Sequence, residues 1–474
     1  MSITGINLRL HRERLGLSQA KLSELTGISQ YLLSAFELEK SELPSSLLDV
    51  IRNALADKDR VVSLAGREKR YRDHKYVSID KQIDRVERVR RTVGNNCYCN
   101  VLNEISSKHL LSKSDAPVAL SLFSGCGGFS LGFSAAGFLV RAYLELEPDL
   151  RAIYRLNFIE SIELGGDITK ITDEKMIDLK NDVGVVDVII GGPPCQGFSL
   201  SGKRKTDDPR NSLFRHYIRF VEVFRPRVAV LENVRLLTSM KDSNGRLVKD
   251  EICTEFHNYG YSIKCFEINA KNYGVPQHRE RVIFVAIRND LQKIPSLPYA
   301  THGQSLDMMS GVLSPIRTFA DACSDLDYLE SGDKSSSDEF HEAVNHPAHV
   351  IEWLWDVPEG RSAHDNKDKS KRPPSGYNTT YKRQVWDEPA STVQTTFGMI
   401  SGCRNVHPIA TRSLTIREAA RIQSFPDSFR FVGNLGAIRT GIGNAVPPLL
   451  AYRLGVHVKK LLDFIEVPGF KVEL

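Results

Sequence analysis

The amino-acid sequence predicts an α/β fold in which a doubly wound, mostly parallel sheet is interrupted by an irregular module and preceded by an all-helical domain. Three observations support this prediction. Apolar, strand-like runs alternate with helical stretches between residues 116 and 290. A stretch rich in Ser, Asp, Gly and Pro follows, with little periodicity. The first 56 residues instead carry apolar side chains at helical spacings.

Composition sets limits on the kind of protein. The chain has 474 residues, enough for two or three domains, and 41% of them are hydrophobic. A net charge of +5 permits nucleic-acid binding without indicating it. No apolar run reaches the roughly 18 residues of a transmembrane helix, and the N-terminus lacks the apolar core of a signal peptide. The eight cysteines are scattered and suggest neither a disulfide framework nor a metal site. We therefore expect a cytoplasmic protein without membrane or metal partners.

Residues 1–56 are expected to form a domain of short helices. Ser18 and Ser29 are suitable N-caps for two of them, and Gly27 marks the turn between. The segment LSQAKLSELTGISQYLLSAFELEK resembles the helix-turn-helix of phage repressors. The resemblance implies that the second helix faces a DNA major groove with Gln30, Tyr31 and Ser34. A plain helical bundle used for protein contacts is the alternative.

Residues 57–115 are predicted to be a charged linker. REKRYRDHKY and IDKQIDRVERVRR combine many basic residues with interspersed acidic ones. Such a pattern favours a solvated helix, and contact with phosphates is a secondary interpretation.

Residues 116–290 supply the first part of the α/β domain. The six strands that we expect span residues 118–123, 140–144, 186–190, 228–231, 263–268 and 282–287. In such sheets, ligands bind beyond the carboxyl ends of the strands.

Residues 291–437 are predicted to be a loop-rich inserted module, which contains all three tryptophans. Residues 438–474 return to the α/β domain through the turn GIGNAVPP and a closing helix. The chain therefore leaves the α/β fold once and rejoins it.

The loop after the first expected strand indicates a nucleoside cofactor. In SGCGGFSLGF, Gly125, Gly127 and Gly128 let backbone amides approach a ligand at a helix N-terminus. Glu145 ends the next strand twenty residues beyond Gly125, the spacing at which doubly wound folds place an acid on a ribose. Asp167 follows as a possible acceptor for an adenine amino group. The GxGG pattern disfavours a dinucleotide, and a simple strand–helix turn is the alternative.

A second set of motifs indicates covalent catalysis. GGPPCQGFS places Cys195 on a Gly/Pro loop after the strand at 186–190, where a thiol is displayed as a nucleophile. Glu232 and Asn233 end the following strand. YGVPQHRERV then places Gln277, Arg279 and Arg281 at alternate positions before the last strand. A structural Cys beside a turn is the alternative for Cys195 alone.

Taken in order, these motifs resemble the DNA (cytosine-5) methyltransferases of bacterial restriction–modification systems. FSGCGGFSLGF, GGPPCQGFS, DDPRNSLF, ENV, YGVPQHRERV, RSLTIREAARIQSFPD and GNAVPP follow the family's order across about residues 117–465. The resemblance does not include the N-terminal helical domain. It implies a Rossmann-like fold that uses S-adenosylmethionine, with a target-recognition module inserted into it.

The resemblance also implies roles for individual residues. Cys195 would add to C6 of cytosine, so that C5 becomes nucleophilic. Glu232, at least partly protonated, would donate to N3. Arg281, supported by Arg279, would hold O2, and Asn233 would orient the base loop. The S-adenosylmethionine pocket would comprise Phe123, Ser124, Gly125, Gly127, Gly128, Glu145, Asp167, Ile168, Pro194, Leu213 and Asn444.

The implied substrate is duplex DNA, from which the target cytosine must be flipped. The loop after Cys195 is expected to be a mobile lid over DNA, with a solvated basic loop as the alternative. Base reading is expected from residues 395–404 and the loops before them. The expected DNA contacts outside the module are Gln196, Ser199, Lys203, Arg204 and Lys205, with Gln30, Tyr31 and Ser34 of the N-terminal domain.

Two other functions are considered, an RNA cytosine-5 methyltransferase and a transcriptional repressor with a vestigial enzyme domain. The long insertion argues against the first, and the intact set of Cys195, Glu232, Arg279 and Arg281 argues against the second. We expect a nucleoid-associated monomer during catalysis, with weak self-association through residues 1–56. Its restriction endonuclease would be a genetic partner only, and the N-terminal domain could repress its own operon.

Overall fold

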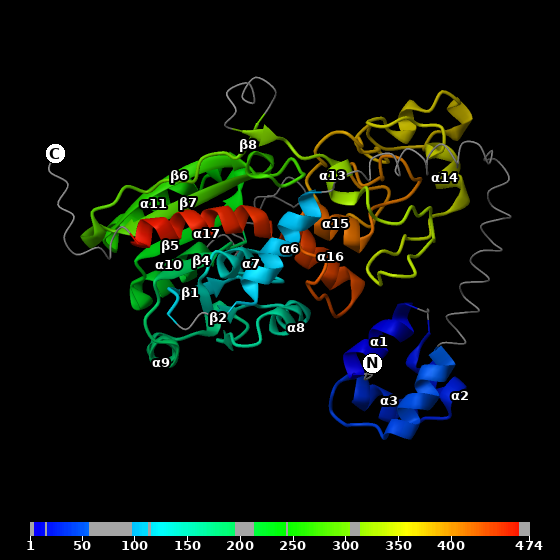
Figure 1. Ribbon diagram of the computed structural model, residues 1–474, viewed down its shortest axis with the longest axis horizontal. Coiled ribbons are helices and arrows are strands. Elements are labelled where there is room, and N and C mark those ends of the chain that lie inside the picture. The colour runs from blue at the N-terminus through cyan, green and yellow to red at the C-terminus, as the bar shows by residue number, and fades with distance from the viewer. Residues whose placement is uncertain are drawn as a thin grey trace.

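The computed structural model describes residues 4–14, 17–55, 97–111, 115–194, 213–242, 245–303 and 313–463. Within these ranges it contains a seven-stranded sheet with helices on both faces, a loop-rich module and a small helical domain (Figure 1). No helix in these ranges is long and apolar enough to cross a membrane.

The large sheet confirms the predicted α/β class. Its strand order is β3-β2-β1-β4-β5-β7-β6, and β1 pairs in parallel with β2 and β4. The pairs β2–β3 and β4–β5 are also parallel, whereas β7 runs antiparallel to both β5 and β6. All six expected strands are present, and β3 is an addition. The bounds are β1 Val118–Leu122, β2 Leu139–Leu144, β3 Ile162–Glu163, β4 Val188–Gly191, β5 Val228–Val234, β6 Tyr261–Asn269 and β7 Glu280–Arg288.

The central strands β1, β4 and β5 are almost entirely buried because both faces of the sheet are covered there. Neighbouring residues of one strand enter different cores, as Ile189 and Ile190 do in β4. One core contains α7 (Gly128–Ala135), α8 (Pro148–Asn157) and α17 (Pro448–Asp463). The other contains α9 (Asp173–Val183), α10 (Leu213–Phe224) and α11 (Val248–Asn258). This two-sided burial explains why the strands read as continuous apolar runs.

Helix α6 (Cys97–His109) lies within the segment that was predicted to be a linker, residues 57–115. Tyr98, Leu102 and Ile105 are buried in the same core as α7 and α17. The Tyr98 hydroxyl donates to the Arg421 carbonyl at 2.8 Å. The described end of this segment is therefore part of the α/β domain. The three buried side chains are separated in the sequence by polar residues, so the helical apolar pattern of α6 is weak.

The inserted module is loop-rich, and the regular elements described in it are short. They are β8 (His302–Gly303), β9 (Ser314–Pro315), α13 (Phe319–Cys323), α14 (Ala348–Leu354) and the 3-10 turns η7 (Ala363–Asp365) and η8 (Lys369–Lys371). The chain then re-enters the large core at α15 (Ile416–Ile422), before residue 438, where we expected the return. The difference arises because all seven residues of α15 are buried, whereas the two arginines and one glutamate in its sequence, IREAARI, suggest a surface helix.

Polar bonds organise the interior of the module. Arg412 binds both carboxylate oxygens of Glu418 at 2.7 and 2.8 Å, and both side chains are buried. Arg383 donates to several backbone carbonyls, including that of Ala410 at 2.7 Å. Arg412 lowers the pKa of Glu418 well below its usual range, against the effect of burial. These side-chain hydrogen bonds fix an irregular backbone that has few backbone hydrogen-bond ladders.

The N-terminal domain contains α1 (Gly5–Arg14), α2 (Gln19–Thr26) and α3 (Gln30–Glu37) around its own apolar core. Ser18 and Ser29 cap α2 and α3 as predicted, and Gly27 adopts the left-handed conformation between them at φ 70°. Arg12 binds Glu37 through two hydrogen bonds of 2.7 and 2.8 Å, which ties α1 to α3. Helices α2 and α3 are thus short, capped at their N-termini and joined by a sharp turn at Gly27.

Candidate active site

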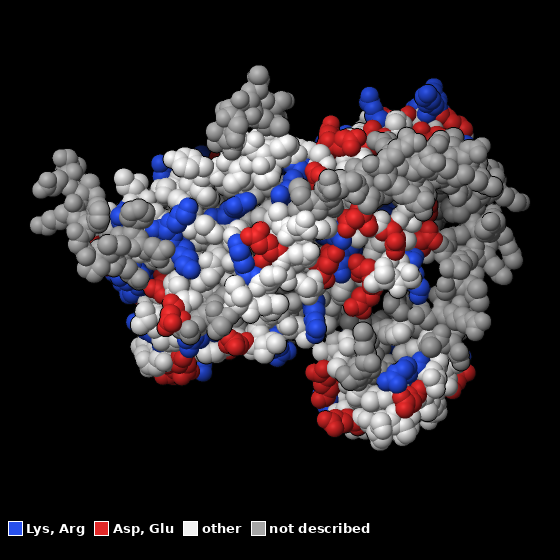
Figure 2. Space-filling view, viewed as in Figure 1, with Lys and Arg blue, Asp and Glu red and all other residues white. Residues whose placement is uncertain are grey.

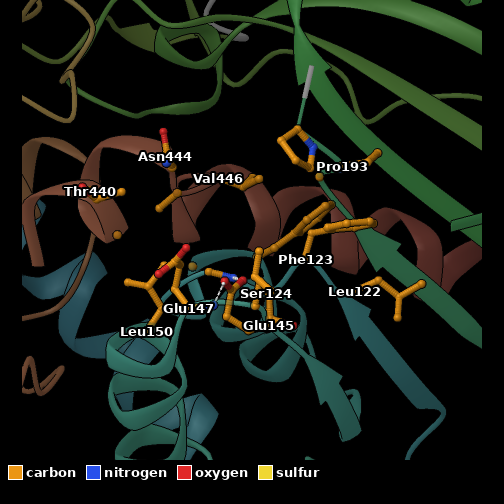
Figure 3. A pocket seen from close by; sticks show the side chains of 18 of the residues that line it. Leu122, Phe123, Ser124, Glu145, Glu147, Leu150, Pro193, Thr440, Asn444 and Val446 are labelled. Atoms are coloured by element: carbon orange, nitrogen blue, oxygen red, sulfur yellow. Dashed lines mark hydrogen bonds between the residues drawn. The ribbon is translucent and has the colours of Figure 1, made fainter. Parts of the chain in front are cut away.

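A cleft of about 1020 Å³ lies beyond the carboxyl ends of β1, β2, β4 and β5. Figure 3 shows Phe123, Ser124 and Glu145 on one side and, opposite, Thr440 and Asn444 of helix α16 (Leu435–Asn444). Every residue of the expected cofactor pocket except Gly127 lines the cleft. The lining set comprises Phe123, Ser124, Gly125, Gly128, Glu145, Asp167, Ile168, Pro194, Leu213 and Asn444.

Gly127 shapes the loop from behind the cleft. It precedes α7 with φ 102°, and a Cβ added to it would lie 2.5 Å from Cε2 of Phe158. Gly125 has φ 57° with open space around it. At Gly128 an added Cβ would lie 2.5 Å from the Val446 carbonyl oxygen. Sterics behind the loop therefore require Gly127 and Gly128, whereas at Gly125 only the backbone conformation favours glycine.

The turn out of β1 is strained and held by hydrogen bonds. Phe123 has φ 52°, an uncommon conformation for a residue with a large side chain. The next residue, Ser124, donates from its amide to the Leu144 carbonyl at 3.1 Å and from its hydroxyl to the Ser121 carbonyl at 3.0 Å. These bonds fix the backbone that carries Phe123 to the cleft.

Two carboxylates in the cleft have opposite environments. Glu145 accepts from the amides of Gly125 at 2.7 Å and Glu147 at 3.0 Å, and burial raises its pKa. Asp167 accepts from the amide and the hydroxyl of Thr169, which lower its pKa. Glu145 thus joins the ends of β1 and β2, whereas Asp167 is an ionised acceptor at the mouth of the cleft.

Glu232 and Arg281 form a buried ion pair beside these residues. Arg281 Nε lies 2.8 Å from Glu232 Oε1, although the angle is not that of a hydrogen bond. Both residues line the cleft. Asn233 donates to the Pro193 carbonyl at 2.9 Å, which connects the end of β5 to the Gly/Pro loop after β4. The structure therefore brings together the end of β5, the two prolines Pro193 and Pro194, and Arg281.

Arg279 has a different position from Arg281. Its side chain is fully buried and donates to the carbonyls of Gly443 and Ala445, both at 2.9 Å, and of Val393 at 3.4 Å. Burial and the neighbouring Arg281 lower its pKa. Arg279 thus supports the site by fixing backbone, and its bonds go to carbonyls rather than toward a base.

Several expected site residues lie outside the described residues, namely Cys195, Gln196, Ser199, Lys203, Arg204 and Lys205. Cys195 directly follows Pro194, which lines the cleft. In the N-terminal domain, Tyr31 is 81% exposed at the start of α3. Gln30 is also exposed and Ser34 is half-buried.

Helix α16 forms one wall of the cleft, and the sequence analysis named only Asn444 among its lining residues. Ala437, Thr440 and Gly441 line the cleft together with the expected Asn444. Their spacing of three, one and three residues is that of one helical face. This periodicity, next to the GNAVPP motif, was the available signal.

Comparison with known proteins identifies the chain. Residues 118–460 match the family model described as C-5 cytosine-specific DNA methylase. The chain belongs to this family. This DNA methylase is 39% identical to the type II methyltransferase M1.HphI of Haemophilus parahaemolyticus over 347 residues, covering 72% of this chain and 86% of that protein. It is 36% identical to M.DdeI of Desulfomicrobium norvegicum over 389 residues, covering 73% and 90%.

A solved structure agrees with this assignment. A prophage-encoded DNA modification methyltransferase of E. coli matches with a TM-score of 0.57 and 25% identity, over 73% of this chain and all of that one. The protein is therefore a DNA (cytosine-5) methyltransferase. The family decides against the RNA methyltransferase and the vestigial repressor as the main function.

The glycine loop yields a prediction with a matched control. We expect Gly127→Ala to lower the free energy of unfolding of this methylase by about 1–3 kcal/mol, because Phe158 occupies the space of the new methyl group. Gly125→Ala should cost about 1 kcal/mol, since it meets only backbone strain. Thermal unfolding of both variants tests this order. Equal melting temperatures would contradict the assigned packing role of Gly127.

Proposed function

We propose that this methylase transfers a methyl group from S-adenosylmethionine to C5 of a cytosine flipped out of duplex DNA, through a covalent bond to Cys195. The observation that carries the proposal is the single cleft that contains both Glu145 and the Glu232–Arg281 pair. Pro194, directly before Cys195, lines the same cleft. A cofactor site and a base site that share one cavity suit direct group transfer between two ligands.

The residues of the cleft fit S-adenosylmethionine. Glu145 holds the glycine loop through the Gly125 amide and offers carboxylate oxygens to ribose hydroxyls. Asp167 suits an adenine amino group as an ionised acceptor. Phe123 and Ile168 add apolar surface for the purine. When bound, S-adenosylmethionine supplies an electrophilic methyl group on its sulfonium.

The chain's own residues would activate the cytosine. The Cys195 thiolate adds to C6 while Glu232 donates a proton to N3, which makes C5 nucleophilic. C5 then forms the new bond to the methyl carbon as the bond from that carbon to the sulfonium sulfur breaks. Loss of the C5 proton to a base, return of the N3 proton to Glu232 and elimination of the thiolate restore the aromatic ring and free Cys195.

The geometry supports separate tasks for the neighbouring side chains. Arg281 orients Glu232 through Oε1, and Glu232 Oε2 lies beside Gly192, where an added Cβ would be 3.1 Å away. Asn233 holds the Gly/Pro loop through the Pro193 carbonyl. In this proposal Arg281 also binds O2 of the base, and residues 395–404 read the surrounding sequence. A restriction–modification system would use this methylation to protect host DNA.

A second, separate function is proposed for the N-terminal domain. Its α2 and α3 have the caps and left-handed turn of a helix-turn-helix, and exposed Gln30 and Tyr31 begin α3. We infer that it binds an operator near its own gene and represses transcription. The face in Figure 2 carries interspersed acidic and basic residues, without an extended patch of one sign among the described residues. Side-chain reading by α3 is therefore a better basis for DNA binding there than charge.

We predict that Cys195→Ser abolishes methyl transfer while folding and cofactor binding remain near the wild-type level, because the thiolate acts only in the chemistry. Transfer of radiolabelled methyl groups to DNA measures the first effect, and calorimetry measures the second. The wild type should form a stable adduct with DNA that contains 5-fluorocytosine, because fluorine cannot leave C5 as a cation. A serine variant with more than a few per cent of the activity would overturn the covalent mechanism.

Glu145→Ala and Asp167→Ala should each weaken S-adenosylmethionine binding by roughly 1–3 kcal/mol, the cost of an unpaired polar group. DNA binding in the absence of cofactor should change much less. The exposed Glu160 provides a matched control, since Glu160→Ala removes a carboxylate outside the cleft lining. Unchanged cofactor affinity of both cleft variants in calorimetry would contradict the assigned pocket.

Deletion of residues 1–56 should leave the methylated sequence unchanged and relieve repression of a reporter driven by the native promoter. Gln30→Ala combined with Tyr31→Ala should have the same effect without truncation, because these side chains would read bases. Sequencing of modified cytosines and a reporter assay provide the two measurements. A changed methylation site, or a reporter that stays repressed, would assign the domain another role.

A further inference from the structure

Helix α16 connects the cofactor cleft to the loop expected to read DNA. One face of the helix, with Ala437, Thr440 and Asn444, lines the cleft. The adjacent face lies under residues 395–404, the recognition loop. A Cβ added to Gly443 would be 2.5 Å from the Thr395 backbone nitrogen, so the loop backbone rests directly on the helix. A shift of the recognition loop therefore has to act on the helix that forms the cofactor wall.

Arg439, one turn before Gly443, makes a second contact with the recognition loop. A Cβ added to Gly398 would be 2.5 Å from Arg439 Nε, 2.7 Å from Cζ and 2.9 Å from Nη2. Several guanidinium atoms at similar distances show that the group lies along Gly398. Met399, next in the loop, is 57% exposed, so Arg439 lies close to a surface of the recognition loop that solvent reaches.

The charge of Arg439 has no counterpart among the residues that the structure describes. Its Nε is buried without a hydrogen-bond acceptor, and no carboxylate of these residues pairs with it. Burial lowers its pKa, with no acidic neighbour to oppose the effect. Arg412, Arg417 and Arg421 of the same region all bind carboxylates. A half-buried guanidinium without an anion is unfavourable unless binding of a ligand supplies one.

We propose that Arg439 binds a backbone phosphate of the DNA that enters the cleft, and so clamps the recognition loop against α16. The inference rests on the proposed function, in which residues 395–404 face DNA. A phosphodiester supplies the missing acceptor and charge, and arginine binds phosphate through two parallel hydrogen bonds. Arg439 is thus a positioning residue that, with DNA bound, strengthens the contact of the recognition loop with α16.

Salt dependence of DNA binding tests this proposal. Each phosphate contact contributes about 0.9 to the slope of log K against log salt concentration. We expect Arg439→Gln to reduce the slope by about that amount and to weaken binding roughly tenfold or more at low salt. The loss should be similar on a duplex that carries the mapped methylation site and on a scrambled duplex, because phosphates carry no sequence information. Arg439→Lys should restore most of the slope.

The full-length protein without cofactor is used, with Arg430→Gln as the control. Arg430 is exposed and shows no side-chain ion pair among the described residues. The salt slope of DNA binding by the Arg430→Gln variant should therefore equal that of the wild type. Arg439→Gln should melt at the wild-type temperature, since it removes no intramolecular ion pair. An unchanged slope, or a large loss of stability, would overturn the proposal in favour of a structural role. Detection of 5-methylcytosine by mass spectrometry tests the methylation chemistry independently of this slope.

Discussion

The antiparallel pairing of β7 with β5 is the constraint on which the site depends. Ligand-binding residues of a parallel sheet follow the carboxyl ends of strands, and Glu232 does so at the end of β5. Because β7 is reversed, the residues that begin it reach the same edge, and Val234 pairs with Arg281. A parallel β7 would place Arg281 at the opposite edge of the sheet. The single reversed strand therefore creates the Glu232–Arg281 pair and gives the cleft both an acid and a cation.

The second requirement is that the returning chain closes the cleft. Arg279, two residues from Arg281, binds the carbonyls of Gly443 and Ala445 at the end of α16. Gln423 donates to the Ala445 carbonyl as well, at 3.4 Å. The segment that carries Arg279 and Arg281 thus fixes the helix that lines one side of the cleft. The three polar side chains of QxRxR accordingly have two tasks: Gln277 and Arg279 bind the returning chain, and Arg281 pairs with Glu232 in the cleft.

The sequence sufficed to predict the sheet and to name many residues that line the cleft, because both depend on local signals. Strands buried on two faces form apolar runs, and residues such as Glu145 follow their ends directly. Arg279 shows the limit, since its partners are backbone carbonyls 164 and 166 residues away, and a carbonyl has no sequence signature. Helix α6 was missed because three buried side chains among polar neighbours give too weak a pattern.

Buried arginines hold the irregular backbone of the inserted module in place. Loops without regular ladders leave backbone carbonyls that need other donors. Arg383 donates to the carbonyls of His407, Ile409 and Ala410, which hold one irregular segment in place. Asn405 does the same on a smaller scale and binds the carbonyls of Thr396 and Met399 in the recognition loop. Because these bonds engage backbone, the exposed side chains of these loops can vary without loss of the loop shape.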